Sequence, residues 1–253
     1  MDISLYVSYN ELYMERNAVR KLIDDLNSFT DGKADLRLRA LPEEEDYLAM
    51  VTGSFPEAAG NEFALSPAGL SVFLIGNEVW GTIRNAIPAA FRRRRRDPSS
   101  LVLAAFRSGP DNPSSPAAEE LRRQMEKEDQ PYLAWSDHTE LWLAIVLLLE
   151  SHPLNPLNGE LQIRKERLYL GYHEILDLTR LPFIRNDEDF IRVRKDMEEE
   201  NNRHNHWDWR YNSEEYDEAV YALYDNTRDT LIREAVERMR KTLRITSPKE
   251  GCL

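Results

Sequence analysis

The run Leu70–Ile75 constrains the fold more than any other stretch of the chain. It reads Leu-Ser-Val-Phe-Leu-Ile, lacks a regular alternation of apolar and polar residues, and lies between Gly69 and Gly76. A short run of this kind is typical of a strand buried on both faces, as in parallel sheets covered by helices. Ligands of such sheets bind outside the carboxyl ends of the strands, where glycine permits close approach. We therefore expect a site at Gly76–Gly81; the plainer interpretation is a strand-to-helix turn.

Strands and helices are predicted to alternate along residues 1–152. Asn10 is the expected N-cap of the first helix, Asp137 or Thr139 that of the last, and Pro88 is expected to interrupt the helix after the central strand. The alternation predicts an α/β fold with a doubly wound parallel sheet flanked by helices. Besides Leu70–Ile75, the predicted strands are Ile3–Val7, Asp35–Leu41, Ser100–Phe106 and Gln130–Trp135, and the helices are Glu11–Phe29, Val79–Arg95, Pro116–Glu128 and Glu140–Ser151.

The segment His152–Gly159 is rich in proline and asparagine and is the predicted domain boundary. Beyond it we expect short antiparallel strands at Leu161–Ile163, Arg167–Leu170 and Glu174–Leu178, and then two long, highly charged helices separated by Asn201–Tyr211. Residues 1–152 would thus form the α/β domain, and residues 153–253 a β-hairpin plus an αα-hairpin extension.

Charge and cysteine usage limit the class of protein. The 253 residues carry a formal net charge of −12, which argues against binding to nucleic acid or to an anionic membrane surface. Cys252 is the single cysteine, so a disulfide framework is excluded and a reducing, cytoplasmic setting is expected. Met1–Leu5 does not resemble a signal peptide, and Leu141–Leu149 is too short an apolar run to span a bilayer.

Five consecutive arginines, Arg92–Arg96, end the helix that follows the central strand. Cations suit a helix C-terminus, where the backbone dipole is negative. The favoured interpretation is a solvated helix end, and the alternative is a patch for an anion or nucleic acid.

Familiar catalytic motifs are absent from the sequence. It contains neither a P-loop nor a Gly-x-Ser-x-Gly nucleophile elbow. His204, His206 and Asp208 are close in sequence, but a zinc site usually takes four ligands, so a polar loop between helices is favoured and no metal is predicted.

Two separated segments carry a family resemblance. Val7–Val19 reads Val-Ser-Tyr-Asn-Glu-Leu-Tyr-Met-Glu-Arg-Asn-Ala-Val, and Leu70–Gly81 ends in Gly-Asn-Glu-Val-Trp-Gly. Together they resemble the uncharacterised TIR-like domains at the N-terminus of bacterial STAND/NACHT ATPases and helical-repeat proteins, which show Val-Ser-Ser-Thr, an acidic-Leu pair, Glu-Arg-x-Ala-Val and, after a buried strand, Gly-x-x-Tyr-Gly. Trp80 takes the tyrosine position. The resemblance implies a flavodoxin-like, TIR-like fold over residues 1–152 and a role in bacterial defence or signalling, either as an assembly module or as an NAD-cleaving effector.

The chain departs from the NAD-cleaving members of this family at one important position. NAD-cleaving TIR domains carry a glutamate as Trp-x-x-x-Glu, whereas Trp80 is followed at that spacing by Arg84, and the helix Gly81–Arg96 contains no glutamate. Cleavage of a glycosidic bond needs a carboxylate. The remaining catalytic candidates are therefore Glu11, Glu15 and Glu78.

The candidate ligand-binding residues follow the first and third predicted strands. Ser8 and Asn10 lie at a helix N-terminus, which suits either an anion or simple capping. Glu15 and Arg16 form either a charged pair at the crevice or an ion pair that positions the first loop. The full set is Ser8, Tyr9, Asn10, Arg16, Gly76, Asn77, Trp80 and Gly81.

These observations favour a signalling or assembly module without a cofactor, which binds protein partners or itself. The alternative is a hydrolase of the N-glycosidic bond of NAD or another nucleotide, with one of the three glutamates as its acid. A third hypothesis is a nucleotide sensor that uses Ser8, Asn10 and Gly76.

Overall fold

A five-stranded, all-parallel sheet forms the centre of the molecule. The computed structural model describes residues 1–7, 11–41, 69–77, 79, 81–109, 115–158, 161–205 and 214–245. The strand order β2-β1-β3-β4-β5 is that of the flavodoxin-like fold, with its topological switch point between β1 and β3. The predicted α/β architecture is thereby confirmed. The strands are β1 (Asp2–Val7), β2 (Arg37–Leu41), β3 (Leu70–Ile75), β4 (Leu101–Arg107) and β5 (Leu133–Trp135).

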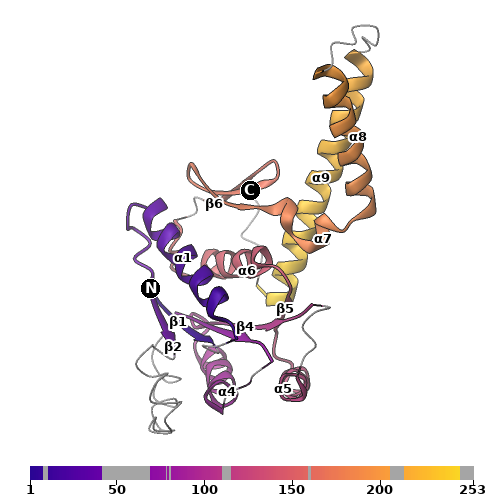
Figure 1. Cartoon of the computed structure of the whole chain (residues 1–253). Coiled ribbons are helices and arrows are strands. Elements are labelled where there is room, and N and C mark those ends of the chain that lie inside the picture. The colour runs from indigo at the N-terminus through magenta and orange to yellow at the C-terminus, as the bar shows by residue number, and fades with distance from the viewer. Residues whose placement is uncertain are drawn as a thin grey trace.

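Helices cover both faces of this sheet, as Figure 1 shows. On one face lie α1 (Tyr13–Phe29) and α6 (His138–Ser151), and on the other α4 (Gly81–Arg96) and α5 (Pro116–Lys127). Successive side chains of β3 point to opposite faces, so Val72 packs toward α1 and α6 whereas Phe73 packs toward α4 and α5. All six residues of β3 are buried, which confirms the expectation of a central strand covered on both sides.

The start of α1 differs from the prediction. Leu12, not Asn10, occupies the N-cap position, and its side chain makes no capping hydrogen bond. Leu12 is fully buried, and the side chain of Glu11 reaches across to the end of β3. The helix therefore begins later than its polar residues suggest, because tertiary contacts hold Glu11 and Leu12.

Of two other predicted helix features, the cap of α6 is confirmed and the interruption of α4 is wrong. Asp137 caps α6 through a hydrogen bond from Thr139 N–H, and Glu140 accepts the N–H of Asp137 in return, which completes a capping box. Pro88, in contrast, does not interrupt α4, which runs continuously through it. The burial of Ile87 and Phe91 against the sheet offsets the backbone hydrogen bond that proline cannot make.

The predicted short strands of the second half are confirmed as β6 (Leu161–Arg164), β7 (Arg167–Leu170) and β8 (His173–Asp177), an antiparallel sheet in that order. Leu168 and Leu170 join the same hydrophobic core as α1 and α6. The small sheet thus covers these helices, and the core continues across residue 152 (Figure 1).

The chain then forms η1 (Leu178–Arg180), α7 (Pro182–Arg185), α8 (Glu188–Asn205) and α9 (Glu214–Leu243). Helices α8 and α9 pair as the predicted αα-hairpin, which projects from the body of the molecule in Figure 1. We call α8 and the facing residues 214–228 the arm. The C-terminal part of α9 returns to the body, where Ile232, Val236 and Met239 join the core. Within the described part of the chain, we find no helix with the length and apolar character that crossing a membrane requires.

Candidate functional site

The carboxyl ends of the parallel strands gather several of the predicted site residues. Gly76 and Asn77 directly follow β3, and Glu11 and Glu15 approach from the start of α1. We call this end of the sheet the carboxyl edge. It is the end at which open α/β sheets bind ligands, and β1 and β3 flank its switch point.

Glu11 closes over the end of β3. Its Oε1 accepts the backbone N–H of Asn77 at 2.5 Å. A β-carbon at Gly76 would lie 2.5 Å from the carboxylate carbon of Glu11, so only glycine leaves room for this side chain. Gly76 therefore admits a close approach, as expected, but the group that approaches is a carboxylate of the chain itself.

Glu15 is the second acid at the carboxyl edge. Its side chain is only 6% exposed, and its Oε1 lies 3.3 Å from a guanidinium nitrogen of Arg107 and 4.0 Å from Nε2 of His138. A buried carboxylate needs such partners to stay charged. The side chains of Arg107 and His138 are 37% and 49% exposed, so both also reach solvent.

Sequence reasoning singled out neither Arg107 nor His138. Arg107 immediately follows the buried run of β4, and His138 opens α6 just after β5. Their sequence positions could have indicated them, because both are polar residues close behind predicted buried strands, and parallel strands end at the same edge of the sheet.

Ser115 is a further residue that the sequence analysis missed. Its Oγ donates to the carbonyl oxygen of Asn77 and accepts the N–H of Ala118 at 3.1 Å, so it caps α5 and ties that helix to the loop after β3. The backbone of Asn77 is thus bound on both sides, by Glu11 and by Ser115.

Asp137 adds a negative charge near the same edge. Burial alone would raise the pKa of Asp137, but hydrogen bonds from Thr139 and the charges of Arg185 and Arg180 lower it below its usual value. The nearest of these charges is on Arg185, at 3.6 Å from a carboxylate oxygen. Asp137 is therefore ionised at neutral pH, where it holds α6 and α7 in place.

The remaining predicted site residues are not all described. Ser8, Tyr9, Asn10, Glu78 and Trp80 lie outside the described residues, and so do His206 and Asp208. Gly81 is the first residue of α4, and Arg16 is a buried residue of α1. Within the described ranges, no group of three or more His, Cys, Asp and Glu side chains is placed to hold a metal ion.

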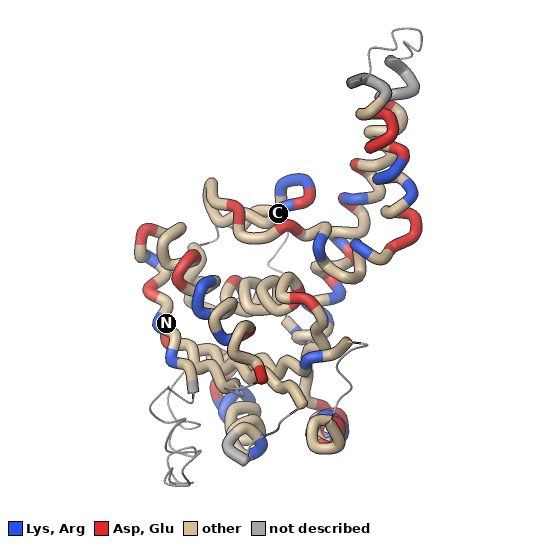
Figure 2. Tube along the Cα trace, in the orientation of Figure 1, with Lys and Arg blue, Asp and Glu red and all other residues tan. Residues whose placement is uncertain are grey.

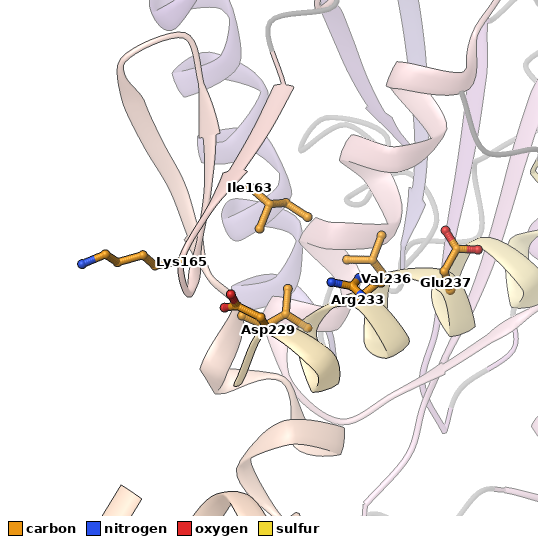
Figure 3. A pocket seen from close by; sticks show the side chains of 7 residues that line it. Ile163, Lys165, Asp229, Arg233, Val236 and Glu237 are labelled. Atoms are coloured by element: carbon orange, nitrogen blue, oxygen red, sulfur yellow. The ribbon is translucent and has the colours of Figure 1, made fainter. Parts of the chain in front are cut away.

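Two cavities lie between α9 and the rest of the body. One of about 280 Å³ opens beside the β6–β7 turn; Ile163 and Val236 line it together with charged groups of both signs, and Lys165 points away from the others (Figure 3). A second, of about 430 Å³, is lined by residues of β5, α6, α7 and α9. Neither contains a predicted site residue, and neither gathers groups of one chemical kind.

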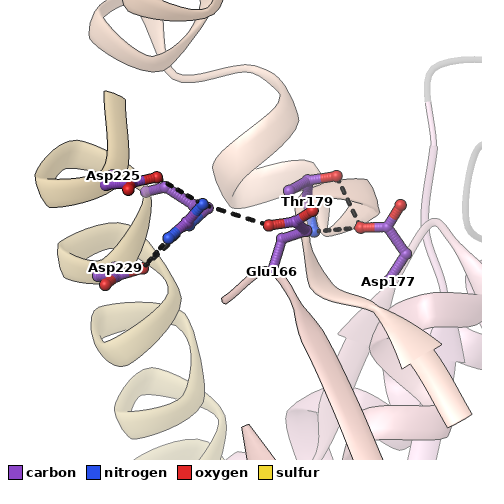
Figure 4. Close-up of polar contacts among 6 residues, drawn as sticks. Glu166, Asp177, Thr179, Asp225 and Asp229 are labelled. Atoms are coloured by element: carbon purple, nitrogen blue, oxygen red, sulfur yellow. Dashed lines mark hydrogen bonds and ion pairs between the residues drawn. The ribbon is translucent and has the colours of Figure 1, made fainter. Parts of the chain in front are cut away.

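Arg228 anchors α9 next to the first of these cavities. Its guanidinium contacts Asp225 and Asp229 on its own helix and Glu166 at the β6–β7 turn, at 2.8 to 3.3 Å (Figure 4). Burial alone would lower the pKa of Arg228, but these carboxylates raise it. The cluster is satisfied internally and has a structural role.

Among the described residues, the carboxyl edge therefore combines the engaged carboxylates of Glu11 and Glu15 with the partly exposed side chains of Arg107 and His138. Such a surface suits contact with an anion or with an acidic partner more than abstraction of a proton. Comparisons with protein families, with curated proteins and with solved structures found no match for this chain.

Proposed function

We propose that the chain is a TIR-like signalling module of bacterial defence or signal transduction, which acts through protein–protein contacts. The observation that carries the proposal is the state of the two described acid candidates. Glu11 holds the backbone of Asn77, and Glu15 is buried against Arg107. Carboxylates that support the fold in this way are poorly placed to meet a substrate.

The arm supplies the contact surface in this proposal. Ile191 on α8 and Leu223 on α9 are 52% and 54% exposed, although both are large and apolar. Charges of both signs lie along the arm (Figure 2). Apolar anchors within a charged rim are the usual composition of a protein–protein interface.

Self-association of the 253-residue chain is the first test. Its mass is measured by light scattering and sedimentation over a range of concentrations, for the wild type and for Leu223→Glu and Ile191→Glu. We expect assembly that both substitutions abolish. The matched control is Tyr172→Glu, since Tyr172 is 92% exposed outside the arm and the substitution adds the same charge. A chain that stays monomeric at every concentration, or that assembles equally well with Leu223→Glu, contradicts the proposal.

The alternative function is an N-glycosidic hydrolase of NAD or another nucleotide. Glu15 is the acid that the geometry favours for it, because Arg107 and His138 stand beside Glu15 and reach solvent where a phosphate would approach. Incubation with NAD separates the two functions. Cleavage that Glu15→Gln abolishes, and that Glu120→Gln on the exposed face of α5 leaves intact, would favour the hydrolase.

A rise in the unfolding temperature with NAD, without cleavage, would instead favour the nucleotide sensor, since a ligand that prefers the folded state stabilises it. We expect neither signal.

A further inference from the structure

A third cavity, of about 280 Å³, lies at the opposite end of the parallel sheet, which we call the amino edge. Three elements that are distant in sequence meet there: the end of α4, the turn after α5 and the residue after α9. The lining residues are Phe91, Arg94, Arg95, Glu128, Asp129, Gln130, Pro131 and Arg244. Three guanidinium groups thus gather at one cavity of a chain whose net charge is −12.

Two of the charges in the lining cancel each other. Arg244 donates from Nη1 to Oδ2 of Asp129 at 2.9 Å and to its carbonyl oxygen at 2.8 Å, and from Nη2 to Oδ1. The hydrogen bond and the charge of Arg244 lower the pKa of Asp129, so this carboxylate is ionised and engaged.

The second carboxylate is also held. Glu128 accepts hydrogen bonds from Gln124 at 3.2 Å and from the buried Gln130 at 2.7 Å, one at each of its oxygens. Amide donors therefore occupy both oxygens of this side chain.

Arg94 is the exception in this cavity. Its Nη1 is buried and, among the described residues, has no hydrogen-bond partner. Burial and the charge of Arg244 lower the pKa of Arg94. A buried guanidinium nitrogen without an acceptor is costly, and a neighbouring positive charge adds to that cost. Arg94 lines the cavity, so an anion bound there would offset the repulsion between Arg94 and Arg244.

We propose that this cavity binds a phosphate group, with the partly buried Arg94 and the exposed Arg95 of its lining as the ligands. Guanidinium groups match phosphate oxygens in paired hydrogen bonds, and they do so better than ammonium groups. The volume lies just below the range of about 300–1,000 Å³ typical of small-molecule sites, so it fits one phosphate group and little more. Free phosphate and a small phosphomonoester share this chemistry.

The test is a titration of the 253-residue chain with inorganic phosphate, followed by the unfolding temperature and by isothermal calorimetry. Sodium chloride of equal ionic strength is the reference. We expect phosphate to raise the unfolding temperature beyond chloride. Arg94→Gln should weaken phosphate binding by about tenfold or more, because a charge-assisted hydrogen bond is lost. Arg92→Gln is the matched control, since Arg92 is exposed in the same run and does not line the cavity.

Folding of the Arg94→Gln variant is checked by its unfolding temperature without phosphate. It should equal or exceed that of the wild type, because the substitution removes a guanidinium nitrogen that is buried without a partner among the described residues. Ribose 5-phosphate then distinguishes the two sources of the group. Tighter binding than inorganic phosphate indicates a phosphomonoester, and equal binding indicates free phosphate.

Three outcomes would overturn the proposal. The first is a phosphate effect no larger than that of chloride. The second is equal phosphate binding by Arg94→Gln and Arg92→Gln. The third is binding of a single-stranded oligonucleotide that both substitutions weaken equally, which would assign the arginine run to a surface contact with nucleic acid.

Discussion

At the carboxyl edge of the sheet the decisive charges are carboxylates from α1, whereas at the amino edge they are guanidinium groups from α4 and α9. Glu11 and Glu15 at the first edge meet donors and cations of the chain itself. At the second edge Arg244 is paired with Asp129, but Nη1 of Arg94 has no partner among the described residues. At the edge where parallel sheets usually bind ligands, the described acids are thus engaged by the chain itself. At the opposite edge, a described guanidinium nitrogen is left without a partner.

The largest expected effect concerns Arg240, a paired and buried arginine near the amino edge. Its guanidinium lies 2.9 Å from Glu150, and the two side chains are 3% and 8% exposed. Arg240→Ala leaves Glu150 buried without its cation and should lower the free energy of unfolding by about 3–5 kcal/mol. Denaturant unfolding measures this loss, with Lys241→Ala at the exposed neighbouring position as control.

The prediction sharpens the comparison of the two edges, because the guanidinium of Arg240 has a carboxylate partner whereas Nη1 of Arg94 has no partner among the described residues. Burial raises the pKa of Glu150 even with Arg240 beside it. When the pKa of a carboxyl group is raised in the folded state, the folded protein loses stability as the pH rises through that pKa. In mild acid, the loss of unfolding free energy caused by Arg240→Ala should therefore be smaller. Equal stability of Arg240→Ala and Lys241→Ala would mean that burial of this pair is unimportant.

The next largest effect is expected at the carboxyl edge, for Glu15→Gln. The amide keeps the shape of the side chain but loses the charge that faces Arg107 and His138. We expect a loss of about 1.5–3 kcal/mol in the free energy of unfolding, as for a hydrogen bond to a charged group. The control is Glu120→Gln, whose side chain is 68% exposed. An unchanged stability would show that Glu15 does not support the fold. The contrast between engaged carboxylates at the carboxyl edge and an unpartnered arginine nitrogen at the amino edge would then fail.

A smaller effect is expected for Gly76→Ala. The new methyl group would displace the carboxylate of Glu11 and break its hydrogen bond to Asn77, at a cost of about 1 kcal/mol. In a Glu11→Ala background the same substitution should cost much less, because the obstructing side chain is gone. A double-mutant cycle of unfolding free energies tests this coupling. Additive costs would contradict the close approach of Glu11.

The smallest effect concerns the pH dependence of stability at the amino edge. His152 is 5% exposed, and burial lowers its pKa below the ordinary value near 6.5. The unfolded chain therefore takes up this proton first, so stability should fall as the pH drops from about 6.5 toward the folded pKa of His152.

Unfolding curves at neutral and mildly acidic pH measure this slope, and His152→Gln should reduce it. His173→Gln, at an exposed position of β8, is the control and should leave the slope unchanged. If both variants keep the wild-type slope, protonation of His152 does not cause the loss of stability at lower pH.

The fold was predictable because burial marks the sequence locally. A strand covered on both faces must be apolar throughout, as Leu70–Ile75 is, and short antiparallel strands must alternate around tight turns. The candidate site was predictable only in location. Glu11 and Asn77 are 66 residues apart, and Arg244 and Asp129 are 115 apart, and local pattern does not indicate such pairings.

The same limit explains the arginine run. Its sequence predicts a cationic helix end, and Arg92, Arg95 and Arg96 are indeed exposed. Whether the charge of Arg244 acts on Arg94 depends on where α9 ends, and that depends on the packing of the whole second half of the chain.

Helix α9 is a single rod that belongs to both ends of the molecule. Its first 15 residues form one side of the arm, and its last 15 return along the body and end directly before Arg244 at the amino edge. At 1.5 Å per residue the helix is about 45 Å long, so a tilt of about 5° about one end displaces the other end by about 4 Å. In mechanical terms α9 is a rigid connection between the arginines of the amino edge and the surface that we propose for assembly.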